Sequence, residues 1–396
     1  MSASASRHPG LVMFALATGG FAIGTAEFAA MSLLPYFSAG LHIDAPTAGH
    51  VISAYALGVV TGAPVIAVLA ARVARRTLLI GLMIFYAVAN LLSGLATDYH
   101  MMLLFRFLSG LPHGAYFGVA ALVAASLAPA NRRAQAVARV MSGLTVATIL
   151  GVPAASWVGF AIGWRWGFVI VAALATLTAL LVWLYAPHDH PAQGASPLRE
   201  LGALGNRQVW LTLATGAIGF GGLFAVYTYV ASTMIEVTHV SEALAPLVLA
   251  IFGVGLTLGN LGAAWAADRA LMPTAAGMFL WSAISLALFP FAAPHLWSLC
   301  IVVFLIGIGG GVGTVLQTRL MDVAGDAQTL AAALHHSAFN LANAIGPWLG
   351  GLAIAAGYGW TSTGWVGSLL ALGGLAILGI AALDARRGVG TAAPAC

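Results

Sequence analysis

Charge is scarce in this sequence, and lysine is missing altogether. Only 7% of the 396 residues are charged, and all fifteen basic residues are arginine. Because ordinary soluble domains carry about 25% charged residues, a soluble globular fold is excluded. The two cysteines, Cys300 and Cys396, are too few for a disulfide framework. We expect the net charge of +4 to reflect membrane topology, with no nucleic-acid partner.

Long apolar runs make up most of the sequence. Hydrophobic residues make up 61% of the chain. Runs of about 20 of them, enough to cross about 30 Å of hydrocarbon, recur from end to end. No cleavage-site pattern precedes the first run, so it is expected to remain as an uncleaved anchor. The pattern predicts an all-α polytopic membrane protein with about twelve spans. They are expected near 10–34, 47–70, 77–96, 99–127, 133–158, 164–186, 209–233, 243–267, 272–292, 295–320, 328–355 and 360–383.

The arginines predict which way the chain crosses the membrane. Twelve spans place both termini on one side, and most arginines fall on that side. Arg165 falls on the other face, and Arg106 lies within a span. Because basic residues concentrate in cytoplasmic loops, both termini are predicted to be cytoplasmic. The arginines on that side are Arg7, Arg72, Arg75, Arg76, Arg132, Arg133, Arg139, Arg199, Arg207, Arg269, Arg319, Arg386 and Arg387.

The chain repeats itself at an offset of 197 residues. Residues 58–72, GVVTGAPVIAVLAAR, align without gaps onto residues 255–269, GLTLGNLGAAWAADR. In a second helix region, Gly110 aligns with Gly307 at the same offset. A shared offset in two separate regions indicates duplicated halves.

The repeat predicts two six-helix bundles, at residues 1–186 and 209–396. The polar segment 187–208 is expected to be a cytoplasmic linker between them. Both bundles start on the same side, so they are parallel repeats. This arrangement suits alternating access to a site between the halves near the midplane of the membrane.

Glu27 is the only acidic residue predicted to lie deep in a span. An ionisable group in hydrocarbon costs several kcal/mol and indicates an ion or proton pathway. Glu27 lies about 10 Å from the outer face if the first span ends near Leu34, and Arg106 lies equally deep if its span begins near Tyr99. A carboxylate beside a guanidinium stays ionised, whereas one moved into an apolar setting takes up a proton. A conformational change that alters the distance between Glu27 and Arg106 would therefore let Glu27 take up and release protons. The alternative is a static pair, which is a poor stabiliser.

Several stretches together resemble the major facilitator superfamily, and within it the twelve-helix drug:proton antiporters of arabinose-efflux-permease-like and chloramphenicol-resistance-like type. The resemblance covers essentially the whole chain and implies an exporter of the bacterial inner membrane that works as a monomer. It also implies an intramembrane arginine in the fourth helix, which Arg106 matches. The stretches are GTAEFAAMSLLP (24–35), AGHVISAYALGVVTGAP (48–64), RFLSGLPHGAYFGV (106–119), SGLTVATILGVPAASWVG (142–159), GNLGAAWAADR (259–269) and FNLANAIGPWLGG (339–351).

The same resemblance implies a cytoplasmic gating motif in the loop after the second span. The arginines of the family pattern GxLADRxGRR are present as Arg72, Arg75 and Arg76, but its acidic residue is replaced by alanine. The second half carries the acid as Asp268, followed by Arg269. We therefore expect an inner gate to depend more on Asp268 than is usual. The alternative for Arg75 and Arg76 is simple anchoring on the positive side.

The fifth span resembles the family's antiporter motif, with Gly151 and Pro153 where the family has an adjacent Gly-Pro pair. Proline kinks a helix and glycine allows close packing, so a bent helix could seal the cavity against leak. An ordinary kinked span is the alternative.

A few polar side chains in the spans are candidate substrate contacts, since small-molecule sites combine apolar walls with a few polar groups. The adjacent His335 and His336 point about 100° apart on a helix, and no metal site is expected. No cofactor or enzyme motif is found in the sequence. The candidates are His113, Tyr116, Tyr227, Tyr229, Asn340 and Asn343.

The leading hypothesis is proton-coupled export of a small molecule by alternating access, with a neutral or cationic sugar or drug as substrate. A proton-coupled sugar symporter or a uniporter for uptake is the alternative, because it would have the same fold. An organic-phosphate exchanger would need several deep cations, and only Arg106 lies deep. A membrane enzyme or receptor has no supporting motif or extramembrane domain.

Overall fold

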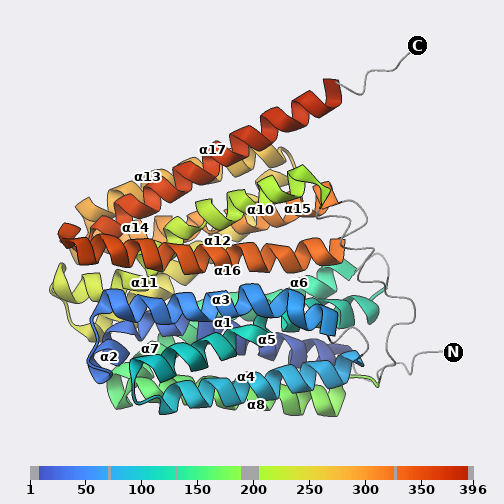
Figure 1. Ribbon diagram of the computed structural model, residues 1–396, viewed down its shortest axis with the longest axis horizontal. Coiled ribbons are helices and arrows are strands. Elements are labelled where there is room, and N and C mark those ends of the chain that lie inside the picture. Colours follow the sequence, from blue (N-terminus) through green and yellow to red (C-terminus); the bar gives the residue numbers. More distant parts are fainter. Residues whose placement is uncertain (1–8, 70–72, 130–132, 189–204, 325–327, 391–396) are drawn as a thin grey trace.

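The computed structural model describes residues 9–69, 73–129, 133–188, 205–324 and 328–390. In these ranges the chain is helical and contains no strand. The long helices run along one common direction in a single bundle (Figure 1). The first six spans are α1 (Pro9–Ser32), α3 (Ala45–Leu69), α4 (Arg75–Leu95), α5 (Tyr99–Ser126), the broken helix α6 (Arg133–Val146), η2 (Ala147–Gly151) and α7 (Val152–Ile162), and α8 (Trp164–Tyr185).

Three spans of the second set of six consist of two helical segments each. The last six are α10 (Arg207–Gly219) with α11 (Gly221–Glu236), α12 (Ala245–Ala267), α13 (Leu271–Ala292), α14 (Leu296–Gly309) with α15 (Val312–Ala324), α16 (Gln328–Ala353) with η5 (Ile354–Tyr358), and α17 (Ser362–Gly390). Eleven segments of the described chain are long and apolar enough to cross a membrane. α16, the other long helix, carries several polar side chains and lies against α3 in the middle of the bundle (Figure 1). The predicted all-α polytopic fold is confirmed.

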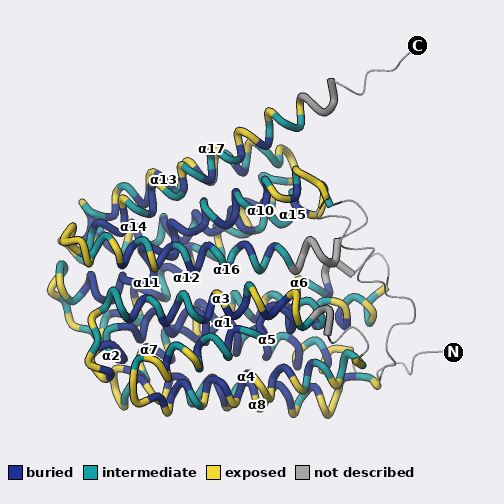
Figure 2. Tube along the Cα trace, in the orientation of Figure 1, coloured by how far each residue is buried: buried dark blue, intermediate teal, exposed yellow. Residues whose placement is uncertain are grey.

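The outer surface of the bundle is apolar. Exposed residues follow the outward sides of the peripheral helices, while the buried ones line the interior (Figure 2). Many of the exposed side chains are large and apolar, among them Trp157, Phe291 and Trp297, the last of which is 84% exposed. Soluble monomers rarely expose contiguous apolar surfaces of this extent. The surface therefore faces lipid, as expected of a multi-pass membrane protein.

The ends of the bundle differ. We call the end where α1 begins and α17 ends the proximal end, and the opposite one the distal end (Figure 1). At the distal end the chain forms α2 (Leu34–Gly40), a short helix that the sequence did not suggest. Pro35 stands in its first turn, where a missing N–H is tolerated. Asp44 then caps α3, and hydrogen bonds from the side chain and backbone of Thr47 hold the pKa of Asp44 below its usual value of 3.8.

The 197-residue repeat is visible in how helices cross. A Cβ on Gly58 of α3 would overlap the carbonyl oxygen of Phe107 on α5. A Cβ on Gly255 of α12 would overlap that of Phe304 on α14. Both glycines and both carbonyls are related by the same offset, since 58 + 197 = 255 and 107 + 197 = 304. The two crossings are therefore equivalent, and each needs glycine for its close approach.

The loops at the distal end repeat as well. His42 follows α2 with φ 55°, and His239 follows α11 with φ 54°. These two are the only described residues other than glycine with a positive φ. They too are 197 positions apart, since 42 + 197 = 239. The bundle boundaries at 186 and 209 stay a prediction, because most of the segment between them lies outside the described residues.

Candidate functional site

Glu27 is the only acidic side chain buried in the described part of the chain, with 7% of its surface exposed. It lies on α1, five residues before the helix ends, and so in the distal half of the bundle. Its Oε1 accepts a hydrogen bond of 3.1 Å from Nδ2 of Asn343 on α16. α1 belongs to the first six spans and α16 to the last six. Glu27 therefore bonds across the interface between the two sets of helices.

Arg106 on α5 is fully buried. Its guanidinium carbon lies 4.3 Å from the ring centroid of Tyr55 and 5.6 Å from that of Phe168. None of its three guanidinium nitrogens has a hydrogen-bond partner in the described structure. Cation–π contacts offset about 2 kcal/mol of the cost of burying such a cation, which is far larger when the cation is unpaired.

The predicted approach of Glu27 to Arg106 is not made in this conformation. No nitrogen of Arg106 lies within 4 Å of a carboxylate oxygen of Glu27. The carboxylate faces Asn343, and the guanidinium lies over Tyr55. The two charges still interact electrostatically through the buried space between them. In this conformation Glu27 and Arg106 therefore interact electrostatically without forming an ion pair.

A chain of hydrogen bonds runs beside Arg106 and contains two residues that the sequence did not single out. The hydroxyl of Tyr86 on α4 lies 3.0 Å from that of Tyr55 on α3. The Tyr55 hydroxyl in turn lies 2.9 Å from Nδ1 of His113 on α5. His113 therefore bonds within the first half. Tyr55 could have been found from its place in AGHVISAYALGVVTGAP, three residues before Gly58 at the close crossing.

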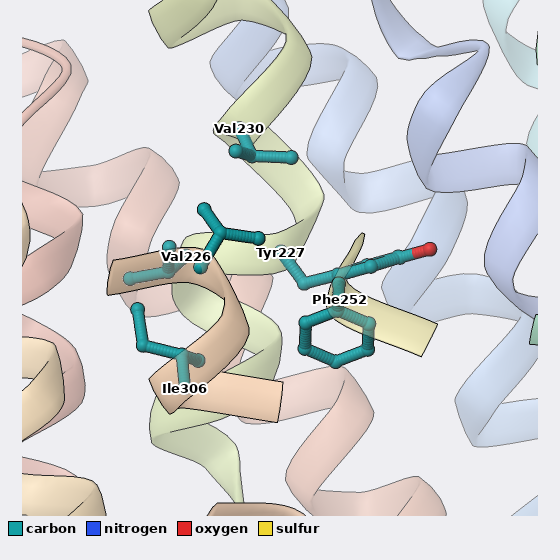
Figure 3. A pocket seen from close by; sticks show the side chains of 6 residues that line it. Val226, Tyr227, Val230, Phe252 and Ile306 are labelled. Carbon is teal, nitrogen blue, oxygen red and sulfur yellow. The ribbon is translucent and has the colours of Figure 1, made fainter. Parts of the chain in front are cut away.

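Aromatic rings line the interface next to Glu27. Phe28 makes an edge-to-face contact with Tyr227 of α11, with centroids 5.5 Å apart, and stacks on Phe224 at 6.2 Å. Tyr227 also packs at 4.4 Å on Phe252 of α12. The buried Tyr227 hydroxyl has no partner in the described structure. Figure 3 shows this hydroxyl pointing away from Val226 and Ile306. It is thus one polar group in apolar surroundings, as a small-molecule site would offer.

The second half has apolar residues where the first has its polar cluster. Phe252 stands 197 positions after Tyr55, and Val303 stands 197 positions after Arg106. Both line a small apolar cavity with Tyr227 (Figure 3). The two halves therefore share the arrangement of their helices but differ in polarity at this site.

Three other predicted substrate contacts lie in helix packing. The hydroxyl of Tyr116 donates to the carbonyl of Leu16 at 2.8 Å and ties α5 to α1. The hydroxyl of Tyr229 donates to the carbonyl of Pro347 at 2.9 Å. Nδ2 of Asn340 donates to the carbonyl oxygen of His336, one turn earlier on α16. In this conformation both tyrosine hydroxyls and Nδ2 of Asn340 bond backbone carbonyls, whereas the buried Oδ1 of Asn340 has no partner in the described structure. Among the predicted contacts, Asn343 is the one whose side chain bonds Glu27.

The predicted gating residues lie at the proximal end. Arg72 lies outside the described residues. Arg76 bonds Nε2 of His188 at 2.8 Å and the carbonyl oxygen of Trp183. The guanidinium of Arg269 lies 3.8 Å over the ring of Trp265 and donates to its carbonyl oxygen. Asp268 ends α12 and makes no ion pair with a described residue. A lock based on Asp268, or on Arg75, stays a prediction.

The regular α-helix of the fifth span is interrupted at Gly151 and Pro153, the residues at which the sequence predicts a bend. η2 is a π-helical turn that ends at Gly151, and Pro153 follows in the first turn of α7. Proline has no N–H to continue the helical bonds, and a π-bulge widens the turn instead. Gly151 packs directly on Thr25 of α1, and a Cβ on Gly253 of α12 would lie 2.6 Å from the carbonyl oxygen of Thr148 in η2. The interrupted segment therefore touches both halves; its role as a seal stays a prediction.

The halves also meet at the distal end outside the spans. Burial and the nearby carboxylate of Glu242 raise the pKa of Tyr36 to about 12. Tyr36 lies on α2, and Glu242 begins η4 (Glu242–Leu244) before α12. Closer to the membrane centre, Ser53 of α3 donates a hydrogen bond of 2.8 Å to the carbonyl of Ala344 on α16. The distal ends of the two halves are therefore in contact.

Comparison with known proteins identifies the family. The family described as Major Facilitator Superfamily matches residues 16–270 and 225–394. The inner membrane transport protein YdhP of Escherichia coli is 38% identical over 92% of this chain and 94% of its own length. A chloramphenicol resistance protein of Streptomyces lividans is 33% identical, over 97% and 98%. A crystal structure of the nucleoside transporter NupG shares the fold, with a TM-score of 0.72 at 14% identity over 94% of this chain and 99% of that one. The chain belongs to the Major Facilitator Superfamily, whose members are membrane transporters and not enzymes.

Proposed function

We propose that the protein exports small neutral or cationic molecules from the cytoplasm in exchange for protons, with Glu27 as the proton-coupling residue. The observation that carries the proposal is the hydrogen bond from Asn343 to Glu27, a buried carboxylate between the two halves. An ionisable group at such a place can link its protonation to the movement of the halves. Residues 1–186 and 209–396 would be these halves, and both termini would be cytoplasmic.

The link follows from the strength of the bond. An ionised carboxylate accepts a hydrogen bond about twice as strongly as a neutral acceptor. Deprotonated Glu27 therefore holds α1 against α16 through Asn343, and a proton on Glu27 weakens this contact. Arg106 favours the ionised form from a short distance away, so it returns the proton when the site opens to the cytoplasm. Proton loading and release would then alternate with movement of the halves.

The substrate class follows from the walls of the interface. The interface beside Phe28 carries the aromatic rings of Phe224, Tyr227 and Phe252 and one hydroxyl without a partner, that of Tyr227. Such walls suit an amphipathic drug-like molecule better than a sugar, which needs many hydrogen bonds. The ionised Glu27 disfavours anions. Relatives named for chloramphenicol resistance and for probable sugar efflux support the outward direction.

The closed distal end supports a cycle of alternating access. Contacts between the halves gather there, at Tyr36, Ser53 and Glu27. With cytoplasmic termini, the distal end is the outer face, so this conformation would be closed to the outside. The protein would act as a monomer, since one chain holds both halves.

The test is proton movement in liposomes that contain the purified protein and a trapped pH dye. Chloramphenicol, arabinose and ethidium are added in turn. We expect chloramphenicol to drive proton movement opposite to its own in the wild type and not in Glu27→Gln, which keeps the shape of the side chain. Undiminished proton movement in Glu27→Gln would contradict the coupling role. Proton and arabinose moving in the same direction would instead indicate uptake by symport.

A further inference from the structure

The hydrogen-bonded chain of Tyr86, Tyr55 and His113 is a polar path through a packed helix core. Its three side chains come from α4, α3 and α5, and none is more than 2% exposed. The two links measure 3.0 and 2.9 Å. Buried hydroxyls and imidazoles must be hydrogen-bonded to be tolerated, and this chain satisfies its members mutually.

The packing of the helices does not require this chain. The equivalent positions of the second half, 197 residues later, are Ala283 for Tyr86, Phe252 for Tyr55 and Gly310 for His113. The glycine-mediated crossing is nevertheless preserved there. Ala283, Phe252 and Gly310 thus allow the same helix crossing without polar side chains. Packing therefore does not explain why the first half has a hydrogen-bonded chain at these positions.

The chain leads from the charged cluster toward the proximal end. Near the outer end of the chain, Tyr86 and the middle member Tyr55 interact electrostatically with the Arg106 guanidinium, which lies over the Tyr55 ring and also interacts with Glu27. At its inner end the His113 ring lies 6.4 Å from the ring of His336 on α16.

His336 can serve as the exit of this path. It is only partly buried, and its ring stacks on Phe117 of α5 at 5.3 Å. The titratable groups that face the His113 ring are Tyr55, whose hydroxyl bonds Nδ1, and His336. Because His336 belongs to the other half, movement of the halves would make or break the inner end of the path.

We propose that Tyr86, Tyr55 and His113 form a proton relay that carries protons from the Glu27–Arg106 cluster to His336 and the cytoplasmic side. The relay rests on the proposed function, for which it supplies the inward route.

The transfer balances without forming a buried ion. A proton arriving at the Tyr86 oxygen displaces that residue's own proton to the Tyr55 oxygen, and the Tyr55 proton passes to Nδ1 of His113. His113 releases the proton of Nε2 toward His336, and the ring is left neutral with its proton on Nδ1. One proton has then moved along the path, and rotation of the two hydroxyls and exchange of the imidazole proton restore the starting state. An imidazole suits this role because its two nitrogens can receive and release a proton in turn.

The test separates proton movement from substrate movement, with chloramphenicol as the probe. His113→Asn places an amide where Nδ1 lies and cannot pass a proton on, and Tyr55→Phe keeps the ring under Arg106. Tyr116→Phe is the matched control, because it removes a buried hydroxyl from α5 that bonds only a backbone carbonyl. Each protein is measured for chloramphenicol-driven proton movement and for exchange of labelled against unlabelled chloramphenicol without a pH gradient.

We expect His113→Asn and Tyr55→Phe to lose at least about 100-fold in proton movement, the scale of a lost proton-transfer group, and to keep exchange within about twofold. Tyr116→Phe should keep both. Wild-type proton movement in His113→Asn would overturn the relay, and so would equal loss of exchange and proton movement in both variants, which would indicate a structural role. If Glu27→Gln also retains wild-type proton movement, both the relay and the proposed function are wrong. If Glu27→Gln loses proton movement while His113→Asn and Tyr55→Phe keep it, only the relay is wrong.

Discussion

Replacing Asn343 with alanine should release the distal contact between the halves. Nδ2 of Asn343 donates to Glu27 across the interface at 3.1 Å, and both residues are buried. A hydrogen bond to a charged group contributes about 1.5–3 kcal/mol. Since each 1.4 kcal/mol is about a factor of ten in an equilibrium, the distally closed population should fall about 10- to 100-fold relative to open states.

Pulsed electron paramagnetic resonance can measure this shift. Spin labels on Ala39 of α2 and Ala243 of η4, both exposed, report the distance between the distal ends of the halves. The matched control is Asn340→Ala, one turn away on the same helix, whose amide bonds its own backbone. We expect a longer distance to gain population in Asn343→Ala alone. An unchanged distance distribution, or an equal shift in Asn340→Ala, would refute the reasoning.

Three further outcomes follow from the repeat and the capping. Gly58→Ala and Gly255→Ala should both lower the thermal unfolding midpoint in detergent, because each new Cβ overlaps a carbonyl oxygen of the crossing helix; a wild-type midpoint in either would contradict the crossing. His42→Val and His239→Val should each cost about 1–2 kcal/mol, since a β-branched residue is strained at positive φ, while the asparagine variants stay near wild type. Asp44→Ala should cost about 1 kcal/mol near neutral pH. Because the pKa of Asp44 is lowered on folding, the contribution of its charge is present above about pH 3.9 and is lost as pH falls further, so melting curves of wild type and variant should converge in acid.

The sequence predicted the architecture well because its signals are local. Apolar runs separated by polar breaks predict helices that cross a membrane, and the structure confirms an all-α polytopic fold. The repeat at an offset of 197 residues also pairs Gly58 with Gly255. The structure confirms this pairing, because both glycines lie where two helices cross closely. Apart from the one at Gly151 and Pro153, the breaks within spans were not predicted from these runs. The interruption at Phe220, between α10 and α11, lies among glycines inside a run without charged residues, and no proline or charge marks it.

The partners within the site were harder to predict. Helix rise placed Glu27 and Arg106 at similar depths but could not give their rotation about the helix axes. Rotation decides that Glu27 faces Asn343 on a helix more than 300 residues away in the chain. It also decides that Tyr116 and Tyr229 donate to backbone carbonyls in the packing of helices. Pairings that depend on the approach of distant helices cannot be read from spacing within one helix.

The most direct measurement of the central claim is accumulation of chloramphenicol driven by a pH gradient in liposomes of defined sidedness. The wild type should concentrate chloramphenicol on the side from which protons enter, and dissipation of the gradient should abolish this accumulation. Glu27→Gln should equilibrate the compound without concentrating it. Accumulation by Glu27→Gln to the wild-type level would contradict the claim that Glu27 couples protons to transport.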